Sequence, residues 1–408
     1  MTWVLLAALW LGLGGTAAQN GSSAGNATCL ACHGQAGATS PSGQSVYVDP
    51  SHFADSVHAS LPCTACHGSI AGYPHPAKME AVNCGTCHGA EAGDIAASVH
   101  AKINAAQAGP AGRAPSPLDM VPCLGCHGDP HAIVPVANAG SPVYPLNIPR
   151  TCGACHGNPA LAKKYGFPDV YAMYMDSIHG FALTKDGLLV AASCSSCHGT
   201  HKILSHTDPQ SRTYRANIPN TCGGCHAGPL AQYLAGIHGR QKEAGNALAP
   251  VCTSCHTAHQ VVQVARASWQ KQTSATCGSC HQNRYATYLD TFHAQVSAIG
   301  YVEAAHCWNC HGNHDILPPS DPKSSVNPAN LLHTCQQCHP DANASFIRYQ
   351  PHADPHNRLA YPHLWFTKQL MNLLLIAVLG FFFLHTILWF LRSMFDRLGR
   401  AARGEGKP

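Results

Sequence analysis

The stretch Cys194-Ser195-Ser196-Cys197-His198-Gly199-Thr200-His201 contains the pattern around which this chain is built. Two cysteines stand three positions apart, and a histidine directly follows the second one. All 22 cysteines of the 408-residue chain fall in eleven such Cys-x-x-Cys-His motifs. The cysteine pairs are Cys29 and Cys32, Cys63 and Cys66, Cys84 and Cys87, Cys123 and Cys126, Cys152 and Cys155, Cys194 and Cys197, Cys222 and Cys225, Cys252 and Cys255, Cys277 and Cys280, Cys307 and Cys310, and Cys335 and Cys338.

Cys-x-x-Cys-His is the attachment signature of c-type haem. Two thiols at this spacing reach the two vinyl groups of one porphyrin and form thioethers, and the following imidazole binds the iron as its proximal ligand. The sequence therefore predicts eleven covalently bound c-type haems. The predicted proximal ligands are His33, His67, His88, His127, His156, His198, His226, His256, His281, His311 and His339.

Disulfide bonds and zinc sites are the alternative explanations of paired cysteines. Exported chains use cysteine pairs as disulfides, and Cys-x-x-Cys can supply half of a zinc site. Neither explanation requires a histidine after every second cysteine. Histidine makes up only 29 of the 408 residues, so its presence in all eleven motifs favours haem attachment.

The length of the chain limits what else can form its core. Eleven haems leave about 37 residues for each, which is too little chain to bury an ordinary hydrophobic core. Gly (37) and Pro (29) are abundant, and no alternating apolar run predicts regular sheet. We expect mostly irregular chain and short α-helices around a stacked array of eleven covalent haems, plus one C-terminal transmembrane helix.

The formal net charge of +4 describes only the polypeptide. Each ferric haem with ionised propionates adds about −1, so the assembled protein is expected to be net acidic. The mild basicity of the sequence therefore does not indicate a nucleic-acid partner.

The N-terminal residues 1–18 form a short apolar segment that ends in Thr16-Ala17-Ala18, which resembles a signal-peptide cleavage site. The segment has no Lys or Arg at its start, and an uncleaved anchor is the alternative. Under both interpretations the chain is exported, which agrees with haem attachment outside the bacterial cytoplasm.

The C-terminal region predicts a membrane anchor. Residues 370–391 contain no Lys, Arg, Asp or Glu and are long enough to span a bilayer. A transmembrane helix is expected at 364–391, followed by a basic cytoplasmic tail at 392–408. The haem domain would then lie in the periplasm, held at the bacterial inner membrane by a single C-terminal span. A buried core helix is the alternative.

The motifs form a two-haem repeat. A first-type motif precedes a short helical stretch that ends in histidine, and a second-type motif follows with another histidine just beyond it. Repeats 1 to 5 begin at Cys29, Cys84, Cys152, Cys222 and Cys277, and a half repeat begins at Cys335. We expect a four-haem part at 19–134 and a seven-haem part at 135–363, with linker-like stretches at 101–121 and 132–149.

Eleven of the eighteen histidines outside the motifs occupy repeated positions and are predicted distal ligands. Those that follow first-type motifs are His58, His100, His179, His238, His293 and His352. Those that follow second-type motifs are His75, His131, His201, His259 and His314. A lone histidine is usually an ordinary surface or core residue, but eleven at matched positions favour ligation. The sequence does not decide which haem each histidine serves.

The periodicity of the helical stretches supports this set. Tyr285, Leu289 and His293 are spaced i, i+4 and i+8, so a single helix would place them on one face. The same spacing recurs before His179 and His238. Methionine, which raises haem potentials, is scarce in the exported part of the chain. Bis-histidine haems of low potential are therefore expected.

The motifs at 194–201 and Ser177-Ile178-His179 resemble those of low-potential multihaem cytochromes c from anaerobically respiring bacteria, and the resemblance covers about residues 26–356. It implies closely stacked haems that conduct electrons. The tail is similar to the C-terminal anchors of cytochromes that dock onto a membrane cytochrome b subunit. That similarity implies a quinol-oxidising partner, whereas small quinol dehydrogenases carry their anchor at the N-terminus.

His385 lies inside the expected span, where an ionisable residue is a functional candidate. It could ligate a haem b shared with the partner. A hydrogen bond to a neighbouring helix is the alternative, because one helix cannot hold a bis-histidine haem alone.

Three functions fit these features. The first is electron transfer between a quinol-oxidising cytochrome b partner and periplasmic or outer-membrane acceptors, with no catalytic residue. The second is a reductase of nitrite, hydroxylamine or a sulfur oxyanion, which requires one haem with an open distal position. The third is a filament of stacked cytochromes, which the membrane anchor argues against.

Overall fold

A computed structural model describes residues 23–76, 79–101 and 123–404. The expected signal segment at 1–18 and nearly all of the expected linker at 101–121 lie outside these residues. The chain forms two compact units. Unit 1 runs to Ala231 and includes Gln241–Gln263, whereas unit 2 comprises Gln232–Arg240 and the chain from Val264 onward. The expected division into four-haem and seven-haem parts stays a prediction.

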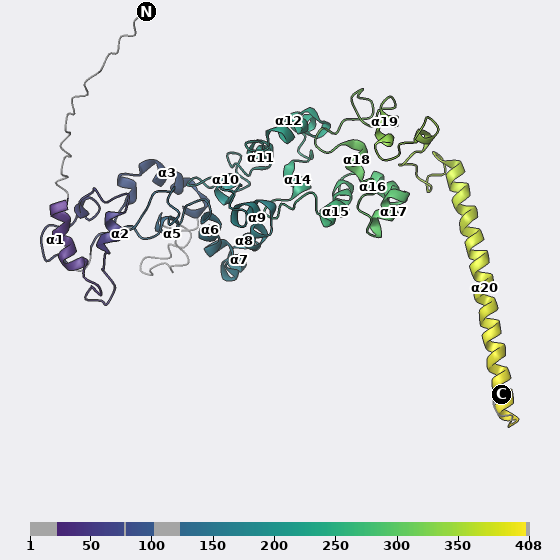
Figure 1. Ribbon diagram of the computed structural model, residues 1–408, viewed down its shortest axis with the longest axis horizontal. Helices are drawn as coiled ribbons and strands as arrows, with labels where there is room; N and C mark the ends of the chain where they lie inside the picture. Colours follow the sequence, from purple (N-terminus) through teal and green to yellow (C-terminus); the bar gives the residue numbers. More distant parts are fainter. Residues whose placement is uncertain (1–22, 77–78, 102–122, 405–408) are drawn as a thin grey trace, which may run out of the picture. The chain divides into compact units, whose positions relative to one another are not determined.

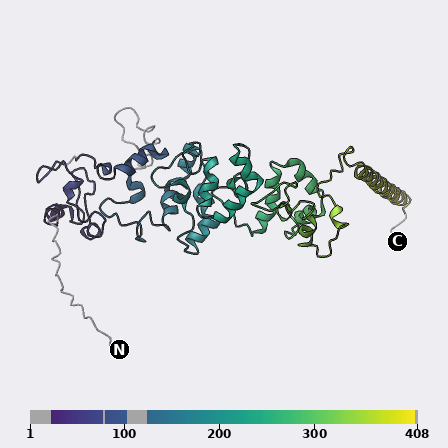
Figure 2. The same cartoon turned by 90° about the horizontal axis from the view of Figure 1, so that it is seen from above.

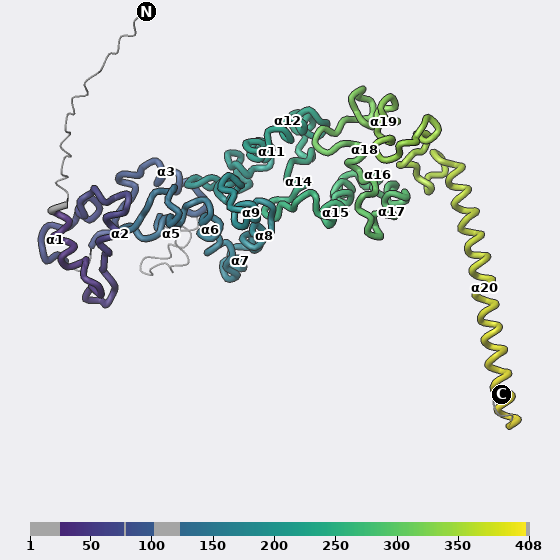
Figure 3. The backbone as a smooth tube through the Cα atoms, in the orientation of Figure 1, coloured from purple at the N-terminus to yellow at the C-terminus, as the bar shows by residue number. Residues whose placement is uncertain are grey.

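Short helices are the main elements of the haem-motif region (Figures 1 and 3). In chain order they are α1 (Ser23–His33), α2 (Pro50–Ala54), η1 (Cys63–Ala65), η2 (Cys84–Thr86), α3 (Gly89–Ala97), α5 (Cys123–His127), α6 (Ile148–His156), α7 (Pro159–Tyr165), α8 (Val170–Met175), α9 (Ile178–Thr184), α10 (Cys194–His198), η3 (Arg215–Asn217), α11 (Ile218–Gly223), α12 (Ala227–Ala235), α13 (Ile237–Glu243), α14 (Cys252–His256), α15 (Ala267–Gly278), α16 (Gln282–Leu289), α17 (Phe292–Ala298), α18 (Cys307–His311), α19 (Leu331–Gln336) and η4 (Phe346–Arg348).

Within the described ranges no strand forms, and the only β-type pairing is an isolated antiparallel bridge between Thr39 and Ser45. Long loops join the helices, as the turned view also shows (Figure 2). The expectation of short helices without regular sheet is confirmed. The abundance of Gly and Pro explains this, because both residues end helices and favour turns.

Helix α20 (Pro362–Ala402) is different in kind from the others. It has 41 residues, its most apolar 18-residue window has a mean hydropathy of 2.4, and none of that window is buried. It is therefore long and apolar enough to cross a membrane, and it contains the whole span predicted at 364–391. The helix extends beyond that prediction at its C-terminal end, through the basic residues that follow Leu391.

A repeated loop leads into three of the first-type motifs. The side-chain amide of Asn147 donates to the carbonyls of Ala139 and Ser141, and the Thr151 hydroxyl donates to the Pro142 carbonyl at 2.6 Å. The equivalent bonds recur from Asn217 and Thr221, and from Asn330 and Thr334. These bonds explain why the sequence pattern Asn-x-x-x-Thr-Cys recurs before these motifs. They also order part of the stretch 132–149, for which the sequence predicts a linker.

The buried residues of the described chain are mostly small and polar. Ser98, Ser141 and Ser177 are almost completely buried, and Leu183 is the largest side chain with no exposed area. Hydroxyl groups of this kind satisfy backbone turns and do not form an apolar core. The polypeptide therefore supplies little of the apolar burial that ordinarily stabilises a chain of this length.

Candidate haem sites

Each Cys-x-x-Cys-His motif forms about one helical turn. The second-type motifs of repeats 2 to 5 are the five-residue helices α5, α10, α14 and α18. In other motifs the histidine N–H donates to the carbonyl of the first cysteine, as His226 does to Cys222 at 2.9 Å. Residues at i, i+3 and i+4 lie on one side of a helical turn, so both thiols and the imidazole can face one ligand. None of the 22 cysteines forms a disulfide.

The two motifs of one repeat lie together. Helix α1 packs against η1 in repeat 1, α6 against α10 in repeat 3, and α11 against α14 in repeat 4. In repeats 1 and 4, the thiol of the first cysteine in the first-type motif lies close enough to the thiol of the first cysteine in the second-type motif for a hydrogen bond. Burial and the Cys29 thiol raise the pKa of Cys63 to about 11, and the hydrogen bond with Cys222 lowers the pKa of Cys252 to about 7. Each repeat therefore brings two attachment sites side by side.

Ten pairs of imidazole rings lie 5.8 to 6.2 Å apart between centroids. Each pair joins one predicted proximal histidine to one predicted distal histidine. The pairs are His33 with His75, His88 with His58, His67 with His131, His156 with His100, His127 with His201, His226 with His179, His198 with His259, His281 with His238, His339 with His293, and His311 with His352.

The separation of the rings matches the space that one metal ion needs. A metal–imidazole bond is about 2.0 Å long and its nitrogen lies about 1.1 Å from the ring centre, so two imidazoles on opposite sides of one ion have centroids about 6.2 Å apart. The interplanar angles of the pairs range from 5° to 64° at nearly constant distance. This is the behaviour of two ligands on one axis, about which each ring can turn.

Other ring contacts in the same chain cover a wider range of centroid distances, up to 6.4 Å between Tyr285 and Tyr288. His306 stacks on Trp308 at 4.4 Å, and Phe346 lies 5.0 Å from His339. Aromatic packing elsewhere in the chain therefore spans centroid distances from 4.4 to 6.4 Å. The ten pairs keep to 5.8–6.2 Å, and each joins one predicted proximal histidine to one predicted distal histidine, as the two axial ligands of one haem iron would be.

Burial keeps many of these imidazoles neutral. Desolvation lowers the pKa of His198 to about 4, with the nearby His259 contributing. Burial likewise lowers the pKa values of His67, His100, His127, His156, His179, His238, His259, His293, His311 and His352. A neutral imidazole has the free lone pair that a metal ligand requires.

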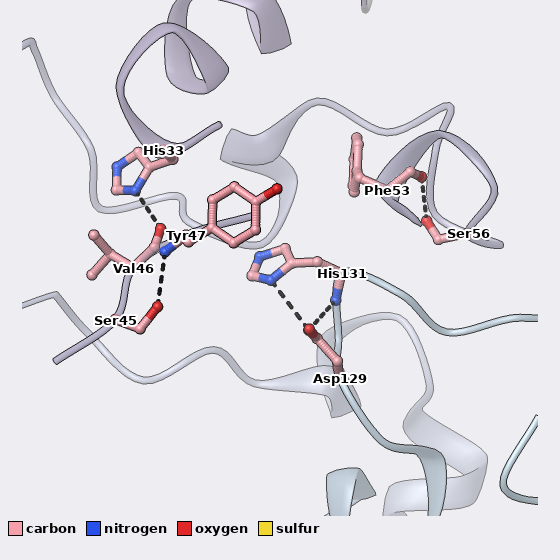
Figure 4. A network of polar contacts seen from close by, with 8 residues as sticks. All are labelled: His33, Ser45, Val46, Tyr47, Phe53, Ser56, Asp129 and His131. Atoms are coloured by element: carbon pink, nitrogen blue, oxygen red, sulfur yellow. Dashed lines mark hydrogen bonds and ion pairs between the residues drawn. The ribbon is translucent and has the colours of Figure 1, made fainter. Parts of the chain in front are cut away.

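Several rings are oriented through their Nδ1 atom. The Nδ1 atom of His33 lies 3.0 Å from the Val46 carbonyl, and that of His131 lies 3.5 Å from the Asp129 carboxylate (Figure 4). The Asp129 carboxylate also accepts the backbone N–H of His131 at 2.9 Å. Hydrogen bonding at Nδ1 leaves Nε2 available and increases the basicity of the ligand.

His352 of the last pair borders a cavity of about 530 Å³ in unit 2. His352, Arg284, Arg348 and Tyr361 are among the lining residues. The Thr287 hydroxyl lies 3.0 Å from Nδ1 of His352. Burial, together with His311 and Arg284, lowers the pKa of His352. The cavity therefore combines a predicted iron ligand with two guanidinium groups, whose charge is of the sign that haem propionates would require.

The helix-face argument of the sequence is wrong in one respect. Tyr285 and Leu289 lie on α16, but His293 lies on a separate helix, α17. The Thr291 hydroxyl caps α17 by accepting the N–H of Ala294, and it stops the first helix two residues earlier. Ser177 makes the same break before His179, where its hydroxyl accepts the N–H of Gly180 at 2.9 Å. Each of these histidines thus occupies the first turn of a new helix.

Two of the predicted distal histidines pair with a motif of the other type from the one that they follow. His352 follows a first-type motif, lies in a turn and pairs with a second-type histidine, His311. His75 follows a second-type motif and pairs with a first-type histidine, His33. The other two predicted ligands, His256 and His314, belong to different units. In the span, His385 stacks near Phe381, with centroids 6.2 Å apart.

Sequence reasoning missed His306. Only 3% of this residue is exposed, its ring stacks on Trp308, and its nitrogens lie 3.2 Å from the Ser274 hydroxyl and from the Val302 carbonyl. It joins α15 to the start of α18. Its place directly before Cys307 was the only signal, and no repeat of that position supported it.

Among residues 23–76, 79–101 and 123–404, no three histidine, cysteine or acidic side chains converge as the ligands of one metal ion would. No family model, no curated protein and no solved structure matches the chain.

Proposed function

We propose that this protein is a membrane-anchored multihaem cytochrome c that carries electrons through eleven covalent haems. The observation that carries the proposal is the set of ten histidine pairs, each with the centroid separation of two axial ligands and with freely varying ring angles. Bound haem would supply a one-electron iron couple at each site.

The residues support a carrier more than a reductase. Each thiol pair holds the porphyrin edge, and the imidazole pair fills both axial positions, so a substrate has no place on those irons. His75 and His352 have the most unusual positions among the distal candidates, and each lies opposite a proximal histidine. No observation favours the open haem that a nitrite, hydroxylamine or sulfur-oxyanion reductase needs.

The membrane part of the proposal rests on α20. Its apolar segment would cross the inner membrane, and the arginines that follow Leu391 would stay in the cytoplasm. The haem-motif region would then lie in the periplasm. A quinol-oxidising cytochrome b subunit is the proposed electron donor, and a periplasmic or outer-membrane protein is the proposed acceptor.

Two measurements on the purified full-length protein test the proposal. A pyridine haemochrome assay is expected to give about eleven haems per chain. Carbon monoxide or nitrite added to the reduced protein is expected to leave the spectrum unchanged, because the axial positions are filled. Bound zinc in place of haem would overturn the proposal, and a high-spin haem with nitrite turnover would replace the carrier with the reductase.

A further inference from the structure

We infer that consecutive repeats exchange distal ligands, so that haem cross-links each repeat to its neighbour. The inference rests on the proposed function and adds the assignment of ligands that the sequence left open. Two reciprocal exchanges and one backbone hydrogen bond support it at the junctions between repeats.

The first exchange runs forward along the chain. In repeats 1 to 5, the histidine that follows the first-type motif pairs with the first-type proximal histidine of the next repeat, and not with that of its own repeat. His58 of repeat 1 faces His88 of repeat 2, and His179 of repeat 3 faces His226 of repeat 4. The same step recurs for His100 with His156, His238 with His281, and His293 with His339.

The second exchange runs backward. In repeats 2 to 4, the histidine that follows the second-type motif pairs with the second-type proximal histidine of the preceding repeat. His131 of repeat 2 faces His67 of repeat 1, at 6.2 Å. The other pairs of this kind are His201 with His127 and His259 with His198. The half repeat has no second-type motif, and there His352, which follows its first-type motif, faces the second-type histidine His311 of repeat 5.

A backbone hydrogen bond joins the two exchanged segments. The residue before a forward histidine donates its N–H to the carbonyl two residues after the backward histidine of the next repeat. Ile178 donates to Val261 in this way at 2.8 Å, beside His179 and His259. The equivalent bonds are Val57 to Ile133, Val99 to Ile203, and Ile237 to Ile316.

This exchange explains why one short segment of the chain belongs to a different compact unit from the residues on either side of it. Gln232–Arg240 belongs to unit 2, although the chain on both sides of it belongs to unit 1. That segment carries His238, which pairs with His281 of repeat 5, and Ile237, which bonds to Ile316. The segment Gln232–Arg240 of repeat 4 is thus held by repeat 5, whose His281 pairs with its His238.

The expected consequence is that one ligand change affects the neighbouring repeat. Removal of His179 should leave the haem attached at Cys222 and Cys225 without its distal ligand, and should leave the haem at Cys152 and Cys155 six-coordinate. Ligation within one repeat predicts the opposite. The two assignments therefore differ in which attachment site becomes open.

The test uses His179→Gly in the full-length holoprotein. The reduced variant is expected to bind about one equivalent of carbon monoxide per chain, whereas the wild type binds none. Adding Cys222→Ala and Cys225→Ala should abolish this binding. The matched control, with Cys152→Ala and Cys155→Ala instead, should retain it. The reverse pattern in these two combined variants would overturn the inference.

A second measurement needs only the single variant. Hydrogen exchange followed by mass spectrometry of His179→Gly should show faster exchange in the peptide around Cys222–His226 than in that around Cys152–His156. Equal or reversed protection would contradict the exchange. If the wild type itself holds far fewer than eleven haems, the proposed function fails. If it holds eleven and only the pattern differs, the ligand exchange alone fails.

Discussion

The histidines of this chain differ in the groups that lie near their ring nitrogens. In the ten pairs the rings face each other across about one metal ion's width, whereas both ring nitrogens of His306 lie within hydrogen-bond distance of protein groups. Composition cannot distinguish these cases, because the residue type is the same. The distinction lies in the partner atoms, and it decides whether the imidazole is available to iron.

The charge of Arg284 is expected to change the reduction potential of the haem proposed between His311 and His352. A positive charge beside iron disfavours the ferric state, so it raises the reduction potential. Arg284→Gln should lower one midpoint potential by on the order of 30 mV, because solvent screens an exposed arginine. Spectroelectrochemical titration measures the shift. Arg284→Lys keeps the charge and serves as the control, and an equal shift in both variants would contradict an electrostatic cause.

His306 is expected to make unit 2 less stable in acid. Burial lowers its pKa below the ordinary value near 6.5, so the unfolded chain binds the proton more readily than the folded one. Its contribution is complete above about pH 6.5 and is lost as the pH falls through the lowered folded-state pKa. If the proposed haems are bound, iron would occupy the imidazoles of the ten pairs and remove them from this titration.

His306→Phe keeps the stacking on Trp308 but cannot bind a proton. The wild type should lose more thermal stability than this variant between about pH 7.5 and pH 5. Circular dichroism melts at several pH values check the difference. Parallel stability curves for the two proteins would exclude His306 as the source of the acid sensitivity.

At the scale of elements, glycine and capping hydroxyls set the geometry around the motifs. Gly153, Gly223 and Gly278 follow the first cysteine of three first-type motifs, and each has a side chain of a later helix directly against it: Tyr171 of α8, Leu230 of α12 and Tyr285 of α16. A Cβ at Gly223 would lie 2.2 Å from Cδ2 of Leu230. The absence of a Cβ therefore lets α12 pack closely on the motif helix α11.

Gly223→Ala is expected to separate α11 from α12. Insertion of one methyl group into a packed contact typically costs about 1–3 kcal/mol. Hydrogen exchange in the peptides of α11 and α12 should accelerate by roughly tenfold or more, which corresponds to about 1.4 kcal/mol. Gly224→Ala is the matched control, since the nearest atom to a Cβ there is 3.6 Å away. Equal exchange in both variants would contradict close packing as the reason for Gly223.

For the whole molecule, the large apolar surface of α20 is the feature that remains without a partner in the described chain. The exposed large hydrophobics include Leu370, Phe383 and Trp389, each more than 60% exposed. The contacts of α20 with the preceding segment are at its first turns, where Arg358 lies over the rings of Trp365 and Phe366. A lipid environment would bury the rest of the helix.

Deletion of 362–408 is therefore expected to release the protein from membranes without loss of haem. Fractionation of cells that express the truncated chain should place it in the soluble periplasmic fraction, with the same haemochrome count per chain as the full-length protein. Retention in the membrane fraction would indicate another anchor, such as an uncleaved N-terminal segment. A fall in the haem count would show that α20 contributes to the fold of the haem region.

The sequence alone determined the features that depend on local spacing. The eleven motifs, the two-haem repeat, the short helices and the apolar C-terminal helix are all readable from residues close together in the chain. This is possible because thioether attachment needs two thiols and an imidazole within one turn, and because a membrane span needs only a run of apolar residues.

The tertiary structure decided which imidazole faces which. The sequence places His179 in repeat 3 and leaves its partner open, and the fold turns it toward His226 of repeat 4. The fold likewise pairs His352 with His311 and His75 with His33. The helix breaks at Ser177 and Thr291 contribute to this, since each restarts the chain in a new direction just before the ligand. Pairing between distant segments depends on the path that the folded backbone takes. The periodicity of residues close together in the sequence does not determine that path.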